Sequence, residues 1–454
     1  MQNSPETSKA FFESLCEEYQ KHNYIDPEYY TRWGVKRGLR NADGTGVLAG
    51  VTQIGNVLGY YVQDGERYPM DGKLIYRGID VEELIDGFVG EGRFGFEETA
   101  YLLLFGALPT RAQLEEFTAI LSENHTLPKM FTEDMILKAP SPDVMNKLAR
   151  SVLALYSYDE NPDDLSLANQ LRQAVQLIAR VPVIVAHAFA VKRHYYDNES
   201  LYLHRPQPGL SVAQNFLYSV RHDNQYTEQE ARLLDLCLVL HAEHGGGNNS
   251  AFACRVLSSS GTDIYSSIAA AVGSLKGPRH GGANKKVSQM FHAIEEGVAD
   301  WKDDDEVSAF LDKLLRKEAG DRSGLIYGMG HAIYTLSDPR AVLLKRYARN
   351  LAEAKGMMDQ FELLEAVERL TPGALVRVKN EKKVVCANID LYSGFVYQMM
   401  GIPEELYTPL FAVARMVGWC AHRIEEVTSP ANRIIRPAYK AVAPMPSLVP
   451  RATR

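Results

Sequence analysis

Residues 240–286 read LHAEHGGGNNSAFACRVLSSSGTDIYSSIAAAVGSLKGPRHGGANKK and hold histidines at the edges of strongly helical segments. His244 follows a long apolar helix and precedes a run of glycines, and His280 lies in a Gly-Pro-rich corner between helices. Helix ends expose unpaired backbone groups, and glycine lets a ligand approach the backbone closely. This stretch therefore predicts a buried helical core in which histidines lie at helix ends, where they can contact a ligand.

Helical patterns continue on both sides of this stretch. Capping boxes begin helices at 110–113 and 227–230, and Asp338 followed by Pro339 begins another. Convincing β-prone pieces occur only between residues 51 and 76, where Asp-Gly turn signals separate them. The sequence thus predicts a mainly α protein with a small β element near the N-terminus.

The bulk composition restricts the classes of function. The chain has 454 residues, with 49 Lys and Arg against 57 Asp and Glu, and a formal net charge of −8. Proteins that bind nucleic acid need an excess of Lys and Arg to neutralise phosphates, so we expect no nucleic-acid partner. No unbroken apolar run reaches the ~18 residues of a membrane span, and the acidic N-terminus does not resemble a targeting segment. We therefore expect no membrane partner and a cytoplasmic location.

Metal binding is a weak alternative for the histidines. His241 and His244 share a helical face, with Glu243 between them, but the chain has no HExxH motif and no cysteine nearby to complete a ligand set. The five cysteines are widely scattered, which is typical of free thiols in a reducing compartment. We therefore predict no metal site.

Two arginines stand in unusual places. Arg415 lies within the apolar segment FAVARMVGW, where an unpaired guanidinium would cost on the order of several kcal/mol. It must pair with a carboxylate of the protein or bind an anionic ligand. Arg340 lies at a helix start, where a cation opposes the helix dipole unless both address one anion; the alternative is a surface arginine.

A loop histidine and a helix-start carboxylate are candidates for proton chemistry. The helix that begins near Asn284 is expected to lower the pKa of His280 and keep the imidazole neutral. Asp390, in ANIDLYSG, is a competent base if partly buried, or else an ordinary helix N-cap.

Several separated segments of the sequence resemble motifs of a single protein family. They are LHAEHGGGNNS with GPRHGGAN, YGMGHAIYTLSDPRA, and NIDLYSGFVYQMMGIP with ARMVGWCAH and RIIRP. In this order they resemble the signature segments of citrate synthases, over roughly residues 45–440. The resemblance implies an all-α homodimer that condenses acetyl-CoA with oxaloacetate and water, through an enolate and citryl-CoA, to give citrate and CoA. It implies a place in the tricarboxylic acid cycle and no tightly bound cofactor.

The resemblance also implies a role for each matched residue. His280 is expected to hydrogen-bond the thioester carbonyl, Asp390 to remove the methyl proton, and His331 to polarise the ketone of oxaloacetate. The residues expected to hold oxaloacetate are His244, Arg340, Arg415 and Arg436, the last reaching into the site of the partner subunit.

The resemblance also implies contacts with CoA. By resemblance, they come from Gly328, Gly330, Asn388, Lys382 and Lys383. Many relatives carry a basic residue within four positions after GMGH, where this chain has threonine, so the two lysines are expected to substitute. The resemblance further implies a small mobile domain at 283–393 and a large, dimer-forming domain at 1–282 and 394–454.

Alternative functions remain open at this point. The nearest is 2-methylcitrate synthase, which uses propionyl-CoA with the same residues, because one added methylene changes selectivity by only about 1–3 kcal/mol. A metal-dependent hydrolase would use His241, His244 and Glu243. A non-catalytic CoA-binding protein would keep the fold without the chemistry.

Overall fold

The computed structural model describes residues 5–64, 66–381, 384–444 and 447–453. They belong to two compact units, one formed by Met1–Gly50 with Ile435–Arg454 and the other by Val51–Ile434. The second unit contains the helical core and most of the candidate site residues. Arg436 belongs to the first unit.

The first unit consists of short helices and extended chain. Its helices are α1 (Pro5–His22), α2 (Glu28–Arg32), η1 (Arg37–Leu39) and η5 (Arg451–Thr453). Its N-terminal and C-terminal parts meet where the Lys440 ammonium lies 4.4 Å from the centre of the Trp33 ring. A cation over an indole face thus links the two ends of the chain.

A small antiparallel sheet opens the second unit. Its strands, hydrogen-bonded in the order β1-β2-β3, are β1 (Gly55–Gln63), β2 (Glu66–Tyr76) and β3 (Ile79–Asp80). Val57 pairs with Leu74, and the register shifts between Leu58 and Tyr60, as at a β-bulge. The prediction of a small β element near the N-terminus is confirmed, and its main part is one long hairpin.

Helices make up most of the second unit, which confirms the predicted mainly α class. In chain order they are α3 (Val81–Gly90), α4 (Phe96–Phe105), α5 (Arg111–Asn124), η2 (Thr132–Leu137), α6 (Val144–Ala154), η3 (Leu155–Tyr158), α7 (Leu167–Tyr196), α8 (Val212–Val220), α9 (Glu228–His241), α10 (Asn249–Ser258), α11 (Ile264–Lys276), α12 (Ala283–Gly297), α13 (Asp304–Leu315), α14 (Pro339–Lys355), α15 (Met358–Lys379), α16 (Ile389–Met399), η4 (Glu404–Leu406) and α17 (Tyr407–Thr428).

Side-chain caps begin helices where the sequence predicts them. The Thr110 hydroxyl accepts from the Gln113 amide and the Thr227 hydroxyl from the Glu230 amide, and each pair completes a capping box. Asp338 caps α14, with a proline at the start of the helix. These local bonds fix where α5, α9 and α14 start, and α9 and α14 lead directly to candidate site residues.

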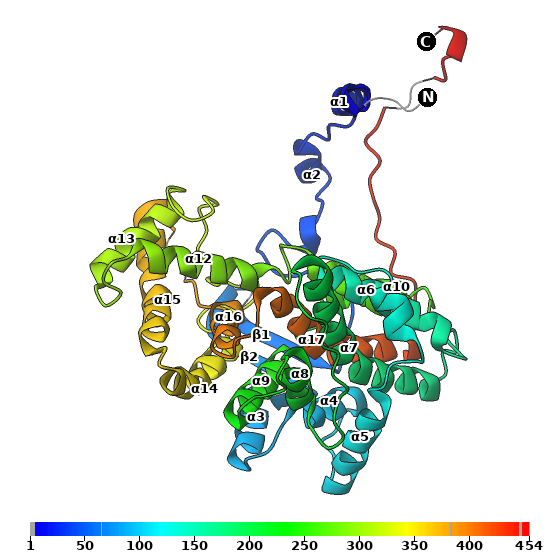
Figure 1. Cartoon of the computed structure of the whole chain (residues 1–454). Helices are drawn as coiled ribbons and strands as arrows, with labels where there is room; N and C mark the ends of the chain where they lie inside the picture. The colour runs from blue at the N-terminus through cyan, green and yellow to red at the C-terminus, as the bar shows by residue number, and fades with distance from the viewer. Residues whose placement is uncertain (1–4, 65, 382–383, 445–446, 454) are drawn as a thin grey trace. The chain divides into compact units, whose positions relative to one another are not determined.

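Helix α17 lies in the middle of the second unit in Figure 1 and packs against α7, α9, α10 and α11. Almost every residue from Leu410 to Ile424 is buried, as expected for a helix surrounded by other helices. Arg415 and Arg423 are among them, each 0% exposed. The centre of the core therefore contains arginine side chains that need partners.

Helix α7 is a second core helix. It is long and apolar enough by composition to cross a membrane, with a window of mean hydropathy 1.8, but 78% of that window is buried inside the protein. His187 in this helix lies 3.0 Å from the Thr132 hydroxyl through Nδ1 and 3.5 Å from the His204 carbonyl through Nε2. His187 is thus a hydrogen-bonded core histidine.

Helices α12 to α15 group together at one side of the second unit in Figure 1. α13 packs on α15, and α14 packs on α16. With the start of α16 they make up segment 283–393, the expected small domain. The contacts of this segment keep it within Val51–Ile434, so the division into a large and a small domain remains a prediction.

Candidate active site

His244 lies in the loop between α9 and α10, which is held from several sides. The Tyr76 hydroxyl is 2.9 Å from the Val239 carbonyl and 3.1 Å from the Glu243 carbonyl. Gly245 has φ of 83°, in the left-handed region that favours glycine. These constraints fix His244, whose Nε2 is buried without a hydrogen-bond partner among the described residues.

Glu243, directly before the loop histidine, belongs to a buried chain of charges. Its Oε1 lies 2.8 Å from His422 Nε2, and both side chains are fully buried. Arg255 Nε donates to His422 Nδ1 at 3.1 Å, so the proton of a neutral His422 ring sits on Nε2 and faces Glu243. A side chain at Gly418 would collide with the Glu243 carboxylate, so α17 carries glycine there.

His331 lies in the loop that leads into α14. Its Nδ1 accepts hydrogen bonds from the backbone amides of Ile333 at 3.1 Å and Tyr334 at 3.0 Å. A neutral ring with Nδ1 as acceptor carries its proton on Nε2. The loop therefore fixes His331 in the tautomer that can donate a hydrogen bond from Nε2 to a ligand.

The same loop rests on the β1–β2 hairpin. The Gly72 amide donates to the Ser337 carbonyl at 3.1 Å, and the Thr335 hydroxyl donates to the carbonyls of Gly59 and Met70. A Cβ at Gly59 or Gly72 would collide with the loop backbone. Thr335, where the family resemblance led us to expect a basic residue, is thus engaged in holding this loop to the hairpin.

His280 lies in the turn between α11 and α12. The Ser250 amide donates to His280 Nε2 at 3.3 Å, and the Ser250 hydroxyl lies 2.9 Å from the same nitrogen. Trp419 Nε1 holds that hydroxyl at 3.1 Å. With Nε2 as acceptor, the neutral ring carries its proton on Nδ1, which is then the donor available to a ligand.

The neutrality expected for His280 follows from a different cause than the one predicted. Burial, followed by the positive charge of Arg415, lowers the pKa of His280 to about 4. The sequence prediction assigned this shift to the N-terminus of the next helix. The direction agrees with that prediction, but the dominant causes are desolvation and a guanidinium from α17.

Asp390 occupies the first turn of α16 without capping it. The N-cap is Asn388, whose side chain accepts from the Asp390 amide at 3.0 Å, so the alternative of Asp390 as an ordinary N-cap is wrong. Burial raises the pKa of the Asp390 carboxyl to about 6, with Arg340 lowering it and Asp338 raising it. Its carboxylate is therefore a stronger base than an exposed aspartate.

Arg340 is paired within its own turn. Its Nε and Nη2 donate to the two carboxylate oxygens of Asp338 at 3.0 and 2.7 Å, and both residues are buried. Burial alone would lower the pKa of Arg340, but the Asp338 carboxylate raises it above its ordinary value. The surface alternative is wrong, and Asp338 offsets the conflict between this cation and the helix dipole.

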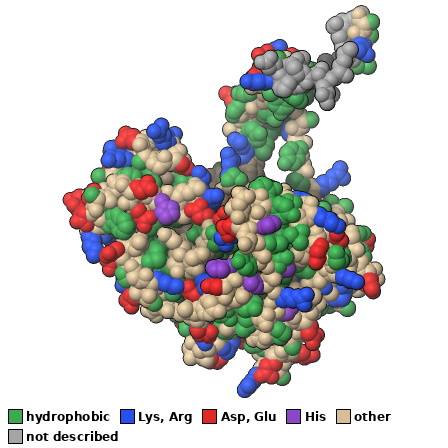
Figure 2. All heavy atoms as spheres, in the orientation of Figure 1, with side chains coloured by type: hydrophobic (Ala, Val, Ile, Leu, Met, Phe, Trp, Pro, Cys, Tyr) green, Lys and Arg blue, Asp and Glu red, His purple; other side chains and the backbone are tan. Residues whose placement is uncertain are grey.

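Arg415 is the least satisfied cation of the site. Its Nε donates to the His241 carbonyl at 2.6 Å, whereas Nη1 and Nη2 are buried without a hydrogen-bond partner among the described residues. Burial lowers its pKa to about 10, which leaves it charged at neutral pH. Figure 2 shows acidic and basic side chains mixed over the visible face, so this buried cation is not part of a basic surface patch there.

These groups lie close together in the second unit. The ring centres of His244 and His331 are 5.2 Å apart. Besides burial, the charges of Arg340 and Arg415 lower the pKa of His244, and the same two arginines act on Asp390. The predicted residues that the structure brings together are His244, His280, His331, Arg340, Asp390 and Arg415.

The other predicted residues have different surroundings. Arg436 is exposed and belongs to the first unit. Lys382 and Lys383 lie outside the described residues. Gly328 and Gly330 have φ of 80° and 95° and shape the turn before His331, where the Gly328 carbonyl accepts from the Asn388 amide at 2.8 Å.

Comparisons with known proteins identify the family. The family description "Citrate synthase, C-terminal domain" matches residues 41–438 of the chain. The citrate synthase of Synechocystis is 36% identical over 376 residues, which cover 81% of this chain and 84% of the relative. This chain belongs to the citrate synthase family.

Other members of the family agree in fold and sequence. The crystal structure of citrate synthase from Thermotoga maritima has a TM-score of 0.73 and 31% identity, covering 92% of this chain and 99% of that one. Citrate synthase from Thermoplasma acidophilum, solved as a ternary complex with carboxymethyl coenzyme A and oxaloacetate, also has a TM-score of 0.73, at 27% identity with the same coverage. The 2-methylcitrate synthase of Shewanella oneidensis is 32% identical and covers 84% of this chain and 92% of that relative. As a family member, the chain is an acyltransferase.

The metal-dependent hydrolase is not supported by the geometry. In the described ranges, no group of three or more His, Cys, Asp or Glu side chains is arranged to hold a metal ion. Glu243, which that alternative needs beside His241 and His244, is engaged with His422 instead.

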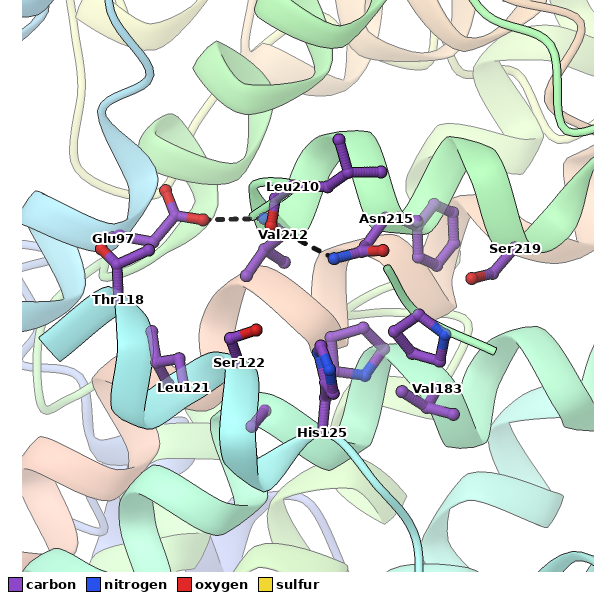
Figure 3. Close-up of a pocket in the computed structure, with 14 residues that line it drawn as sticks. Glu97, Thr118, Leu121, Ser122, His125, Val183, Leu210, Val212, Asn215 and Ser219 are labelled. Carbon is purple, nitrogen blue, oxygen red and sulfur yellow. Dashed lines mark hydrogen bonds between the residues drawn. The ribbon is translucent and has the colours of Figure 1, made fainter. Parts of the chain in front are cut away.

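A separate cavity lies between α4, α5, α7 and α8 (Figure 3). It encloses about 40 Å³, and its wall includes Glu97, His125 and Asn215. Glu97 already accepts from the Val212 amide at 2.7 Å. A water needs about 10–15 Å³ of such space, so the cavity has room for a few waters and not for oxaloacetate or CoA.

Sequence reasoning did not single out some residues that shape the site. Asp338 was expected only as a helix cap, whereas it also pairs with Arg340. The Glu243–His422 pair joins residues 179 positions apart, and no local pattern marks it. Tyr334 stacks on His331 with ring centres 4.5 Å apart. The only sequence signal that could have indicated this contact is a tyrosine three residues after a loop histidine.

Proposed function

We propose that this enzyme condenses acetyl-CoA with oxaloacetate and water to give citrate and CoA. The observation that carries the proposal is the guanidinium group of Arg415, buried close to His244. In the described part of the chain, its two terminal nitrogens and His244 Nε2 have no hydrogen-bond partner. A buried cation with open donors is costly until an anion binds it. Oxaloacetate has two carboxylates, which match the open donors of this arginine cluster.

Oxaloacetate binding is the first step of the proposed mechanism. Arg415 and Arg340 hold its carboxylates, and His244 Nε2 makes a further polar contact. His331, with its proton on Nε2, donates a hydrogen bond to the ketone oxygen. This bond draws electron density from the ketone carbon and prepares it for attack.

Enolate formation is the second step. The Asp390 carboxylate removes a proton from the methyl group of acetyl-CoA, and His280 Nδ1–H hydrogen-bonds the thioester oxygen as negative charge builds on it. A thioester methyl is a very weak acid, so the base and the donor must act together. A neutral His280 suits this role because it stabilises the oxygen without protonating it fully.

Carbon–carbon bond formation follows. The enolate carbon attacks the ketone carbon. The ketone oxygen then takes the proton that His331 Nε2 donates to it, which gives citryl-CoA. Water then cleaves the thioester, which releases citrate and CoA. A domain formed by 283–393 that closes after oxaloacetate binds would protect acetyl-CoA from the same hydrolysis.

The remaining expectations are part of this proposal. The chain acts as a cytoplasmic homodimer without a tightly bound cofactor, and Arg436 reaches the substrate in the partner subunit's site. CoA passes the turn at 328–330 and Asn388, with Lys382 and Lys383 near its phosphates. Truncating Arg436 to Ala should then raise the KM for oxaloacetate in the dimer.

A thiol-release assay tests the proposal. With acetyl-CoA, CoA thiol should appear only when oxaloacetate is present, and EDTA should leave the rate unchanged. The His331→Ala variant should lose most of kcat, whereas His187→Gln, which changes a core histidine of α7, should retain it. Thiol release that does not depend on oxaloacetate, or an H331A variant with normal kcat, would overturn the proposal.

A second acyl donor is tested in the same assay. The 32% identity to a 2-methylcitrate synthase makes propionyl-CoA the specific alternative. Selectivity for one methylene is worth about 1–3 kcal/mol, or 10- to 200-fold in kcat/KM. We propose acetyl-CoA as the preferred donor, and a higher kcat/KM for propionyl-CoA would reassign the enzyme to 2-methylcitrate synthesis.

A further inference from the structure

Tyr334 is a buried residue of the site with no assigned role. Its side chain is 3% exposed. Its ring stacks on His331 with ring centres 4.5 Å apart and planes at 27°, and it meets the His244 ring edge-on at 5.6 Å. The Arg340 guanidinium lies 5.7 Å from its ring centre. The ring is therefore in contact with three residues of the oxaloacetate site.

The hydroxyl of Tyr334 is the unusual part of this side chain. It is buried and has no hydrogen-bond partner in the part of the chain that the structure describes. Buried tyrosine hydroxyls generally find a partner, because leaving one unpaired costs free energy. In the same core, the Tyr76 hydroxyl reaches backbone carbonyls and the Tyr265 hydroxyl lies 2.6 Å from the Asp159 carboxylate. The open Tyr334 hydroxyl thus resembles the open donors of Arg415.

The charges around this hydroxyl are mainly positive. Burial raises the pKa of Tyr334, and the guanidinium groups of Arg340 and Arg415 act against that shift, while Asp338 adds to it. The hydroxyl is therefore within electrostatic reach of both arginines expected to hold oxaloacetate. An anion bound by both would find the Tyr334 O–H as a neutral donor beside them.

The position of the ring is tightly constrained. The Tyr334 amide donates to His331 Nδ1 at 3.0 Å, so the same residue sets the tautomer of the ketone-polarising histidine. A Cβ at Gly72 would collide with the Tyr334 ring, so the ring packs directly against the backbone of the hairpin at this glycine. A donor held this firmly binds its acceptor with little loss of side-chain freedom.

We propose that Tyr334 is a substrate-binding residue whose hydroxyl donates a hydrogen bond to a carboxylate of oxaloacetate held by Arg340 and Arg415. This inference rests on the proposed function, because it places oxaloacetate in the same site. It predicts a role in binding oxaloacetate and none in binding the acyl donor.

The test compares Tyr334→Phe with the full-length wild type. Because the hydroxyl has no hydrogen-bond partner among the described residues, its removal should leave the packing intact, and the thermal midpoint without ligand should stay the same or rise. Calorimetric titration with oxaloacetate alone should show a Kd raised about tenfold or more, since the lost bond is to a charged group. The KM for oxaloacetate should rise in parallel, and the KM for acetyl-CoA should stay unchanged.

The Tyr265→Phe variant is the matched control. It removes a buried hydroxyl that is bonded within the protein, so it should lower the thermal midpoint and leave the Kd for oxaloacetate unchanged. A Y334F variant with the wild-type Kd would overturn the role of Tyr334 while the proposed function stands. A wild-type protein that does not bind oxaloacetate would overturn the proposed function itself.

Discussion

Arg415 and Arg423 lie two turns apart on α17 and are equally buried, yet their surroundings differ. Arg423 donates from Nε to the Gln170 side chain at 3.2 Å, and from Nη1 and Nη2 to the carbonyls of Ser258 at 3.5 Å and Thr262 at 2.5 Å. Among the described residues, Arg415 has one hydrogen bond, from Nε, and its Nη1 and Nη2 have no hydrogen-bond partner. Burial lowers the pKa of both.

The difference separates a structural arginine, Arg423, from Arg415, for which we propose ligand binding. Burial disfavours both cations, and hydrogen bonds to the described residues offset that cost more fully at Arg423. At Arg415 the protein keeps open donors that no part of its own described chain fills. Burial and sequence context do not distinguish the two positions, whereas the count of satisfied donors does.

Replacing each arginine by leucine should produce the largest contrast. Arg415→Leu should lower kcat/KM for oxaloacetate by about a thousandfold, since losing one partner of a buried charge pair costs ~4 kcal/mol. It should leave stability unchanged or higher, because an unsatisfied buried cation is removed. Arg423→Leu should lower the free energy of unfolding by ~3 kcal/mol, because the Gln170 side chain and two carbonyls lose their donors.

Urea unfolding and steady-state kinetics on both variants measure this contrast. Oxaloacetate should stabilise the wild type and R423L against urea, but not R415L. If R415L unfolded more easily than R423L while retaining normal kcat/KM, the assignment of the two arginines would be reversed.

The carboxylate near Arg415 should show the next largest effect. Asp390→Asn keeps the shape of the side chain and removes the base, so kcat should fall by about 300-fold, within the 10²–10⁴ range of a positioned general base. Oxaloacetate binding should survive, because the open donors of Arg415 remain. A loss of oxaloacetate affinity equal to the loss of kcat would place Asp390 in binding and not in proton removal.

The pH dependence of kcat tests the role of Asp390 as the base in a second way. Since burial raises the pKa of Asp390 to about 6, kcat should fall about tenfold per pH unit below that value as the base is protonated. His280, with a pKa lowered to about 4, should stay mostly neutral above pH 5, so it should not affect kcat between pH 5 and pH 8. A kcat that stays level from pH 8 down to pH 5, as expected for an aspartate with an ordinary pKa, would contradict the assignment.

The stability linkage of Asp390 has the opposite sign to that of most carboxylates. Its folded pKa lies above its unfolded value, so its protonated form favours the folded state at low pH. That contribution is lost as pH rises from about 4 through about 6. D390N should therefore be more stable than the wild type above pH 6, and the difference should shrink as pH falls.

The smallest effect should come from removing a hydrogen bond that holds the His331 loop to the β1–β2 hairpin. Thr335→Val removes the hydroxyl that ties the His331 loop to the hairpin, so the KM for oxaloacetate should rise by about threefold for ~0.7 kcal/mol of lost hydrogen bonding. The KM for acetyl-CoA should not change, because Thr335 is engaged with Gly59 and Met70. A larger effect on acetyl-CoA would mean that Thr335 contacts CoA after all.

Local signals predicted much of this structure from the sequence. The caps at Thr110, Thr227 and Asp338 depend on neighbours three residues away or fewer, so their patterns are readable along the chain. The ordered motifs predicted the residues that meet at Arg415. The predicted cause of the His280 pKa shift was wrong because Arg415 is 135 positions away in the chain. The N-cap alternative for Asp390 was wrong because the helix begins two residues earlier, with Asn388 as the N-cap that accepts from the Asp390 amide.

Long-range partners account for what could not be predicted. His422 finds Glu243 and Arg255 only through the packing of α17 against the α9–α10 loop and α10. The open hydroxyl of Tyr334 is the absence of a bond, which no pattern of residue types encodes. Burial and hydrogen-bond satisfaction are properties of the assembled core, so they become visible only in the structure.

The bonding of residues 333–337 to the β1–β2 hairpin limits how segment 283–393 can move. The Gly72–Ser337 and Thr335–Gly59 bonds join residues assigned to opposite sides of the proposed division at 283. A rotation of 283–393 must either break these bonds or leave that short length of chain stationary with the hairpin. In the second case residues 333–337 keep their place on the hairpin, while Asp390, in the moving segment, changes its distance from His280 on the other side of the division.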